Sequence, residues 1–386
     1  MRLNHYRSVF APLVLAAAAG ICSAQATDNK KEADKKPDAA AAPAPAPVWS
    51  VGPIDFSGLV DAYYSVNFNH PASRVNGLRN FDVKANQFSL NMAKLTLEHA
   101  ADPVGFRVDF GFGRAFEIIH ATEPKDTPSV MRNVEQAYVS LKPPKGKGFQ
   151  LDFGKFVTSA GAEVIETHTN WNYSRSLLFA WAIPYYHFGA RASMPVNGQF
   201  TIGAQLVNGW NNVEDNNAGK TVGLTSAYVT KKVSWFQNYY AGPESAPVGK
   251  KRGMRHLYDT TLLFTPDDKF NAYVNFDYGQ DRDPGKVKSV WNGLAAAAKF
   301  QASPMFAISP RIEFFSDHNG FSTGTAQRVK EFTLTGEAKM KEGMFTRIEY
   351  RHDWSNVAFF ERGSGGLRKN QDTFLIGFVA YFGPKR

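Results

Sequence analysis

The feature of this sequence that most constrains its fold is a two-residue alternation of hydrophobic side chains, which recurs from about residue 54 onward. In the last such segment, 373–382, the even positions carry Phe, Ile, Phe, Ala and Phe, and the odd positions carry a mixed, weakly apolar set. Successive side chains of a β-strand point to opposite faces, so this segment has one face suited to hydrocarbon. A soluble sheet could use such a strand in its core. Here, however, the pattern recurs with no helical layer to cover it, which favours strands whose apolar faces meet lipid.

Roughly sixteen segments follow this pattern. Segment 106–112 carries Phe, Val, Phe and Phe at even positions and Arg, Asp and Gly at odd positions, and segments 56–68, 270–278 and 344–353 alternate in the same way. Segment 87–98 changes phase midway, which predicts a β-bulge. Segment 233–240 does not indicate which of its side chains share a face.

The connections between these segments alternate in length, which supports the same fold independently. Short turns on one side of the membrane and long loops on the other are typical of bacterial outer-membrane barrels. We therefore predict an all-β fold: a transmembrane antiparallel up-and-down β-barrel of about 16 strands, with short periplasmic turns, long outer loops and both termini in the periplasm. The long connections are 69–86, 114–133, 157–186, 208–220, 241–255, 280–290, 317–328 and 354–370, and the short ones lie at 101–103, 143–146, 195–199, 230–232, 265–269, 302–305 and 341–343.

The N-terminal residues are expected to lie outside the barrel. A basic start and an Ala-rich apolar stretch precede Ala24-Gln25-Ala26, so residues 1–26 are predicted to be a secretory signal peptide cleaved after Ala26. Residues 27–52 are rich in Lys, Ala and Pro, and such a segment is expected to form a disordered periplasmic tail. The barrel is expected to comprise residues 53–386. An exported barrel of this kind belongs in the outer membrane of a Gram-negative-type bacterium.

Composition excludes several functions. The only cysteine, Cys22, is lost with the predicted signal peptide, which argues against disulfides and against a cysteine-ligated metal. The formal charge of +9 falls to +7 without Arg2 and Arg7, and this excess is spread along the chain, so nucleic acid is not an expected partner. No cofactor and no metal site are expected.

Ionic residues on the inward-facing positions of the strands are the main candidates for function. A basic residue on the lipid face costs about 2–4 kcal/mol at mid-bilayer, so these ions are expected to face the lumen. Mixed charges across a water-filled pore would order polar solutes. The alternative is that they pair with one another and brace a plugged barrel. The predicted pore-lining residues are Arg107, Asp109, Arg191, Asp259, Asp277, Arg311, Glu313, Arg347, Glu349, Arg351 and Asp353.

Motifs in the middle of the chain resemble those of the OmpL-like family of β-barrel porins. They are the run Gly154–Glu163, the sequence Asn172-Tyr173-Ser174-Arg175-Ser176, His187-Phe188-Gly189 and Asn208-Gly209-Trp210, and Arg347–Arg351 is similar to the family's penultimate strand. The resemblance covers about 54–382 and implies a porin without naming its solute. Barrels of this kind usually end on an aromatic residue that the barrel-assembly machinery recognises, whereas four residues follow Phe382 here.

The resemblance also implies a role for connection 157–186, which is the third outer loop. In general porins this loop folds into the barrel and narrows it. Here it contains Glu163, Glu166 and Arg175, together with the apolar run 177–181, which needs the barrel interior or a neighbouring subunit to pack against. We expect this loop to be the constriction. A surface flap without a gating role is the alternative.

A catalytic function is not expected. No His-Glu-x-x-His or Gly-x-Ser-x-Gly motif is present, and Gly363–Gly366 lies in a long loop. Outer-membrane barrels can nevertheless be hydrolases with catalytic groups at the outer rim, where His168, His256, His318 and His352 are expected to lie.

The sequence thus predicts a non-enzymatic outer-membrane porin for passive diffusion of small polar solutes or ions. A plugged barrel that serves as a surface scaffold or adhesin is the main alternative. Expected partners are outer-membrane lipids, the solutes or ions themselves and the barrel-assembly machinery, which would bind the last strand. A homotrimer is also possible.

Overall fold

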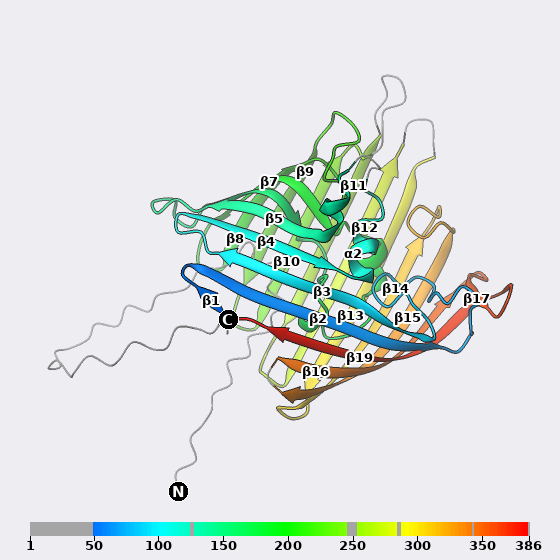
Figure 1. Ribbon diagram of the computed structural model, residues 1–386. Helices are drawn as coiled ribbons and strands as arrows, with labels where there is room; N and C mark the ends of the chain where they lie inside the picture. Colours follow the sequence, from blue (N-terminus) through cyan, green and yellow to red (C-terminus); the bar gives the residue numbers. More distant parts are fainter. Residues whose placement is uncertain (1–48, 124–126, 245–252, 284–286, 342, 385–386) are drawn as a thin grey trace, which may run out of the picture.

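A continuous ring of backbone hydrogen bonds organises the chain (Figure 1). The computed structural model describes residues 49–123, 127–244, 253–283, 287–341 and 343–384, so the predicted signal peptide and most of the predicted tail lie outside the described residues. Within these residues sixteen antiparallel strands form the ring. The strands are β2 (Ile54–Asn67), β3 (Gln87–His99), β4 (Val104–Phe112), β5 (Val134–Leu141), β6 (Gln150–Val157), β7 (Tyr186–Pro195), β8 (Phe200–Val207), β9 (Thr221–Val229), β10 (Val233–Gly242), β11 (Met254–Phe264), β12 (Phe270–Arg282), β13 (Ser289–Gln301), β14 (Phe306–Asp317), β15 (Gln327–Lys341), β16 (Met344–Ser355) and β19 (Asn370–Phe382).

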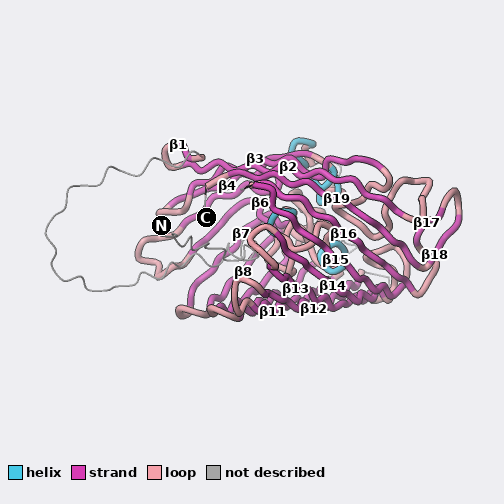
Figure 2. The backbone as a smooth tube through the Cα atoms, turned by 90° about the horizontal axis from the view of Figure 1, so that it is seen from below, coloured by secondary structure: helices cyan, strands magenta, loops and turns pink. Residues whose placement is uncertain are grey.

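The ring closes between its last and first strands. β19 pairs with β2 from Thr373 opposite Asn67 to Phe382 opposite Gly58, and each of the other strands pairs with its neighbours in sequence. A closed barrel has no unpaired strand edge, which is the condition for a sheet to cross hydrocarbon. Seen from below, strands run along both margins of the molecule with loop segments between them (Figure 2). The predicted fold class and strand number are confirmed.

Three short strands lie outside the ring. β1 (Ser50–Val51), at the end of the predicted tail, pairs with β2. β17 (Phe360–Arg362) and β18 (Gly366–Arg368) form a hairpin within the outer loop between β16 and β19. The ring of Trp49 lies 4.9 Å from that of Phe382, so the start of the described chain packs on the end of the last strand.

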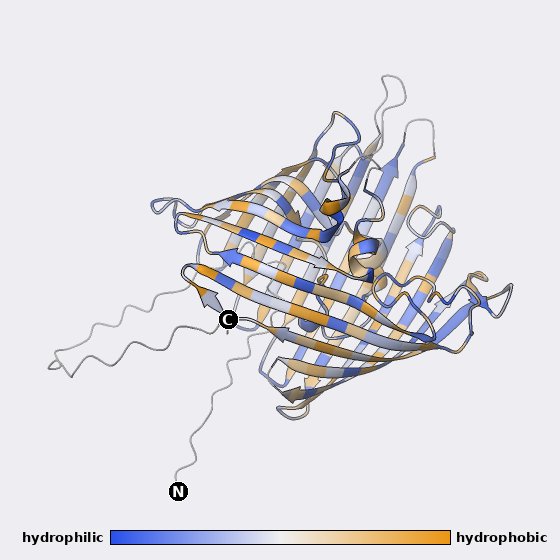
Figure 3. Ribbon diagram, in the orientation of Figure 1, coloured by the Kyte–Doolittle hydropathy of each residue, from blue (hydrophilic) through white to orange (hydrophobic). Residues whose placement is uncertain are grey.

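The predicted alternation of faces is present around the wall (Figure 3). On β19 the outward Phe378 is 55% exposed, whereas its inward neighbour Val379 is 1% exposed. On β10, whose sequence did not indicate its faces, Trp235 and Tyr239 point outward and Asn238 points inward. The outer surface is therefore a hydrophobic band, and the polar side chains are enclosed.

The phase change predicted in 87–98 is a β-bulge at Asn91. The pairing of β2 with β3 passes from Asp61 opposite Met92 to Ala62 opposite Leu90, so Asn91 is the extra residue. A one-residue insertion exchanges the two faces of a strand. Odd positions point inward before the bulge and even positions after it, which brings Lys94 into the lumen.

Short helices lie in the outer loops. They are α2 (Arg114–Ile119) and the 3-10 turn η1 (Ser129–Asn133) in one loop, and η2 (Thr167–Thr169) and α3 (Leu177–Trp181) in another. Among the described residues, no helix has the length and hydropathy needed to cross a membrane. The long and short connections alternate as predicted.

Candidate functional site

The connection between β6 and β7, residues 158–185, folds into the barrel, and we call it the inner loop. Ser159 Oγ donates a hydrogen bond to Asn238 Oδ1 on β10 (2.7 Å), and Tyr173 Oη donates one to Asp61 Oδ1 on β2 (2.5 Å). Because β2 and β10 lie eight strands apart in a ring of sixteen, they face each other across the lumen. The inner loop therefore spans the full width of the barrel.

Arg347 on β16 binds the backbone of the inner loop. Its guanidinium donates to the carbonyl oxygens of Thr167 (2.7 Å), Asn172 (2.9 Å) and Asn170, and it also forms an ion pair with Glu337 on β15 (2.7 Å). Arg347 is 1% exposed. The planar guanidinium carries five donors in fixed directions, which suits it to several carbonyls at once. One wall residue thereby fixes a whole turn of the loop.

Glu349, two residues further along β16, makes the complementary contact. Its carboxylate accepts hydrogen bonds from the backbone N–H groups of Tyr173 (2.6 Å) and Ser174 (2.9 Å), and from Thr335 Oγ1 on β15 (2.7 Å). The Tyr173 ring lies directly on Gly377 of β19, where a Cβ atom would come within 2.3 Å of the ring. The absence of a side chain at this position admits the loop.

Two more arginines of the wall hold the same segment. Arg311 on β14 pairs with Glu163 (2.7 Å) and donates to the carbonyl oxygen of Ser174 (2.8 Å). Arg351 on β16 donates to the carbonyl oxygen of Arg175 (2.7 Å). Displacing the loop would leave buried guanidinium groups of the wall without these partners, so the contacts favour its inserted position.

A cluster of three carboxylates around Lys94 holds another part of the inner loop. Lys94 on β3 forms ion pairs with Glu166 of the loop, with Glu135 on β5 (2.8 Å) and with Asp109 on β4 (3.4 Å). The carboxylate oxygens of the three acids lie within 4.8 Å of one another, a spacing that could hold a metal ion. The Lys94 ammonium already supplies the positive charge among them. Without a metal ion, the cluster therefore already links the inner loop to the barrel wall through ion pairs.

The apolar run 177–181 forms α3 and packs inside the barrel. The Ser176 side chain caps this helix by accepting from the Phe179 N–H (3.0 Å). Phe179 packs against Phe81 of the outer loop 68–86, with ring centroids 5.9 Å apart. The sequence left open whether this run packs in the barrel interior or on a neighbouring subunit, and the structure places it in the barrel interior.

The outer loop between β4 and β5 contacts the strands that flank the inner loop, at Lys155 on β6 and Tyr186 on β7. His120, just after α2, receives a hydrogen bond at Nε2 from the Lys155 ammonium (2.7 Å), and Glu123 accepts one from the Tyr186 hydroxyl. Burial and the neighbouring Lys155 cation lower the pKa of His120 to about 3, so it is neutral and can accept. The mouth of the barrel is thus filled by more than one loop.

The predicted pore-lining ions divide into two groups. Arg107 and Arg191 keep 23% and 11% of their side chains exposed, and they pair with Asp109 (3.1 Å) and Asp152 (2.8 Å). The other nine are buried, and a selectivity role for them stays a prediction. They are Asp109, Asp259, Asp277, Arg311, Glu313, Arg347, Glu349, Arg351 and Asp353.

Asp259 and Asp277 occupy facing positions on β11 and β12, and Asp259 also accepts from the Gly161 N–H of the inner loop (3.1 Å). Glu313 accepts from the N–H of Leu178 (3.3 Å). All three residues predicted for the constriction lie in the inner loop: Glu163 and Glu166 pair with wall cations, and Arg175 donates to the loop's own carbonyl oxygens.

Sequence reasoning missed several members of this network. Arg79 of loop 68–86 pairs with Asp353 (2.7 Å) and Asp82 (2.6 Å), and nothing in its sequence context indicated an inward position. Glu331 and Glu337 lie on the inward positions of β15 and could have been found by the alternation rule. Lys94 could have been found only by following the alternation across the phase change at Asn91.

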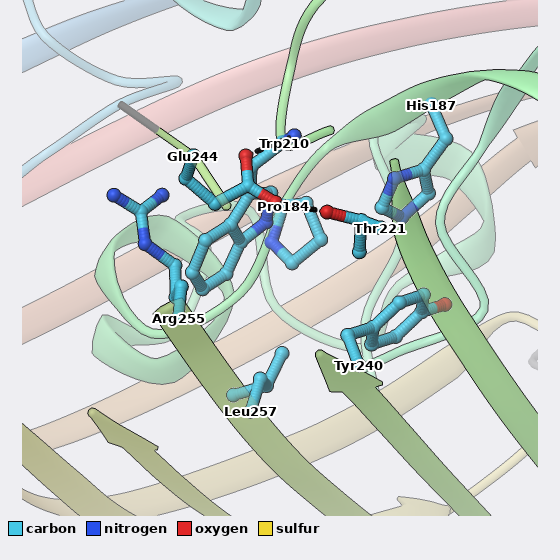
Figure 4. A pocket seen from close by; sticks show the side chains of 8 residues that line it. All are labelled: Pro184, His187, Trp210, Thr221, Tyr240, Glu244, Arg255 and Leu257. Atoms are coloured by element: carbon cyan, nitrogen blue, oxygen red, sulfur yellow. Dashed lines mark hydrogen bonds between the residues drawn. The ribbon is translucent and has the colours of Figure 1, made fainter. Parts of the chain in front are cut away.

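A small cavity lies where the mouth of the barrel meets the inner loop (Figure 4). The Glu244 carboxylate accepts hydrogen bonds from the backbone N–H of Trp210 (2.7 Å) and from Thr221 Oγ1 (2.5 Å). The Arg255 guanidinium lies over the Trp210 ring at 4.7 Å. Burial raises the pKa of the Glu244 carboxyl, and Arg255 opposes that shift. The cavity holds about 10 Å³, which is room for one water molecule and for no larger ligand.

The histidines expected at the outer rim do not converge. The expectation is wrong for His168, which stacks on Tyr381 near the periplasmic end of β19, with ring centroids 5.1 Å apart. His256 receives a hydrogen bond from Tyr239 (2.8 Å), His352 lies 2.7 Å from Asp372, and His318 contacts Asn292 (3.2 Å). These three are on the outward face of the wall. Among the residues that the structure describes, no two of the four share a site.

The chain matches one family model, described as "Putative beta-barrel porin-2, OmpL-like", over residues 53–382. No curated protein matches it.

Solved outer-membrane proteins resemble it in fold. They include OmpT of Vibrio cholerae (TM-score 0.58, 12% identity, covering 85% of this chain and 97% of that one) and an anion-selective porin from Comamonas acidovorans (0.57, 10%, 85% and 99%). The channel DcaP of Acinetobacter baumannii is similar to the same degree, with a TM-score of 0.58 at 9% identity, covering 85% of this chain and 97% of that one. At these identities the likeness concerns the fold alone.

Proposed function

Because this chain belongs to the OmpL-like family of β-barrel porins, a family of passive-diffusion channels of the outer membrane, we propose that the inner loop is the constriction of its pore. Small polar solutes or ions would pass the loop down their concentration gradient, without a cofactor or an energy source. The observation that carries this proposal is the contact of the loop with both β2 and β10, which face each other across the lumen.

The charges around the loop support a selective path. Cations of the wall (Arg311, Arg347 and Lys94) face acids of the loop and of neighbouring strands within a low-dielectric enclosure. Although each cation is paired with an acid, these fixed charges make the surroundings of the loop polar, which favours polar solutes over apolar ones.

Single-channel recording tests the proposal. Signal-free protein, residues 27–386, is refolded into planar bilayers, and its conductance is compared with that of a variant lacking residues 161–179. A variant lacking residues 214–218, in the tip of another outer loop, is the matched control. We expect stepwise ohmic openings and a higher conductance for the first deletion alone. Unchanged conductance in a correctly folded variant would remove the inner loop from the constriction.

One alternative rests on a specific observation. Nine predicted pore-lining ions are buried, loop 68–86 packs on the inner loop, and the loop that carries α2 contacts the adjoining strands β6 and β7, as expected for a plugged barrel that serves as a scaffold or adhesin. A silent, heat-modifiable barrel in the same bilayers would favour this alternative. A salt gradient across an open pore would give the preferred ion through the sign of the reversal potential.

We further propose that the protein is a channel and not an enzyme, because its rim histidines lie apart on the outward face. Export would follow cleavage after Ala26, with Phe382 read by the assembly machinery. A homotrimer is proposed from the trimeric form recorded for OmpT of Vibrio cholerae (TM-score 0.56, 13% identity). Crosslinking of the purified barrel in detergent, followed by unheated electrophoresis, tests this assembly.

A further inference from the structure

An open groove lies on the outward face of the barrel, at the outer ends of β13, β14, β15 and β16. It encloses about 580 Å³ and is lined by the polar side chains of Asn292, Ser316 and His318, the cations Arg328 and Lys330, and the Trp354 ring. Each of these strands meets a long outer loop at this end. The groove therefore faces the membrane at the level of its outer surface.

The groove carries an excess of positive charge. Arg328 and Lys330 are exposed, lie two residues apart on the same face of β15, and form no ion pair with a carboxylate among the described residues. The Lys330 ammonium lies over the Trp354 ring at 5.5 Å. The outward carboxylate on nearby β19, Asp372, is already held by Tyr350 (2.6 Å) and His352 (2.7 Å). An anionic ligand would therefore find two cations available.

The position of these cations fits a membrane surface. A basic residue on the lipid face is strongly unfavourable at the bilayer midplane but nearly without cost at the interface, where headgroup phosphates lie. Below the cations the wall becomes apolar, with Phe314, Phe332 and Ile312 exposed between 38% and 58%. A ligand that places a phosphate beside Arg328 and acyl chains along this wall would match both surfaces.

We propose that this groove binds the phosphate of an anionic lipid headgroup in the outer leaflet. The lipid phosphate supplies the negative charge that Arg328 and Lys330 have no partner for, the Asn292 side chain supplies a further polar contact, and the Trp354 ring anchors the boundary between headgroup and chain. A free phosphate would satisfy the cations and leave the apolar wall uncovered. The inference rests on the placement of the barrel in a membrane and not on conduction, so a silent channel would leave it intact.

Native mass spectrometry of the detergent-solubilised mature barrel tests this site. The barrel is titrated with a bisphosphorylated acylated glucosamine disaccharide, with the same lipid lacking its phosphates, and with inorganic phosphate alone. The variant R328Q/K330Q is compared with K231Q/K232Q, which removes the same charge from the exposed periplasmic turn 230–232. All four residues are exposed, so both variants are expected to fold, and heat modifiability checks this.

We expect R328Q/K330Q to weaken binding of the phosphorylated lipid roughly 30-fold, because each surface cation contributes about 1 kcal/mol and 1.4 kcal/mol is tenfold. The turn variant should bind as the wild type does, and the dephosphorylated lipid should not distinguish the three proteins. Equal lipid affinity in all three, or inorganic phosphate binding as tightly as the lipid, would overturn the proposal. A change of oligomeric state in R328Q/K330Q without a lipid effect would also overturn it and assign the groove to a second copy of the chain.

Discussion

The carboxylate of Glu349 offers the sharpest way to loosen the inner loop without altering its sequence. In Glu349→Gln the side chain keeps its shape, but only one of the two oxygens that accept from Tyr173 and Ser174 remains an acceptor. The amide group then points N–H donors at a backbone N–H donor. Glu349 is 1% exposed, so bulk water does not replace the lost bond.

The expected cost follows from these two contacts. Loss of one hydrogen bond to a charged group costs about 1.5–3 kcal/mol, and a buried donor left without a partner costs about 1–3 kcal/mol. Together the inserted state of the loop should lose about 3–5 kcal/mol relative to a displaced state in which water solvates both groups. Since 1.4 kcal/mol is tenfold, the population of displaced loops should rise roughly 100- to 4,000-fold.

Single-channel recordings measure this change as transitions from the resting conductance to a larger one. Glu349→Gln should show such transitions far more often than the wild type, at an unchanged resting level. Glu117→Gln is the matched control, because Glu117 is an exposed carboxylate on α2 that contacts Arg114 and not the inner loop. Recordings of a folded Glu349→Gln barrel with wild-type current noise would refute the idea that this carboxylate holds the loop.

Two further substitutions probe the same packing. Gly377→Ala should place a methyl group within 2.3 Å of the Tyr173 ring, which should destabilise the barrel by about 1–3 kcal/mol in urea unfolding and increase the current noise of its channels. The control is Gly336→Ala, where the nearest atom lies 3.9 Å away, and it should unfold as the wild type does. Lys94→Met should leave the Glu135 and Glu166 carboxylates without their cation, beside an Asp109 whose remaining cation is Arg107, and lower stability by about 3–5 kcal/mol; millimolar Ca²⁺ should restore part of it. The control variant Lys231→Met should have the stability of the wild type, and Ca²⁺ should not alter it. A Lys94→Met barrel as stable as the wild type would contradict this account.

The barrel itself could be predicted from the sequence because its determinants are local. Alternation of side chains fixes which face of each strand meets lipid, and the cost of a charge in hydrocarbon makes that assignment strict. The connection lengths then fix the side of the membrane on which each loop lies. Even the bulge at Asn91 left a local signal, since it reversed the phase of a single segment.

The contacts of the lumen could not be predicted in the same way, because they join residues far apart in the chain. Arg79 meets Asp353 across 274 residues, and no local pattern links a loop arginine to a strand carboxylate. The parity rule correctly turned Arg347 and Glu349 inward. It could not say that backbone carbonyls and N–H groups of the inner loop, and not permeating solute, would be their partners.

These partners change which charges a permeating ion meets. A wall cation that already binds loop carbonyls, as Arg347 does, contributes its field but offers no free donor to a solute. Arg107 and Arg191 differ, because both lie near the short periplasmic turns and keep part of their side chains exposed. Arg107 pairs with Asp109 (3.1 Å) and Glu98 (3.4 Å), and Arg191 pairs with Asp152 (2.8 Å), and none of these contacts is to the inner loop. The periplasmic half of the lumen is therefore where the fixed charge of this barrel is most accessible to a passing solute, and the outer half is where the loops restrict its size.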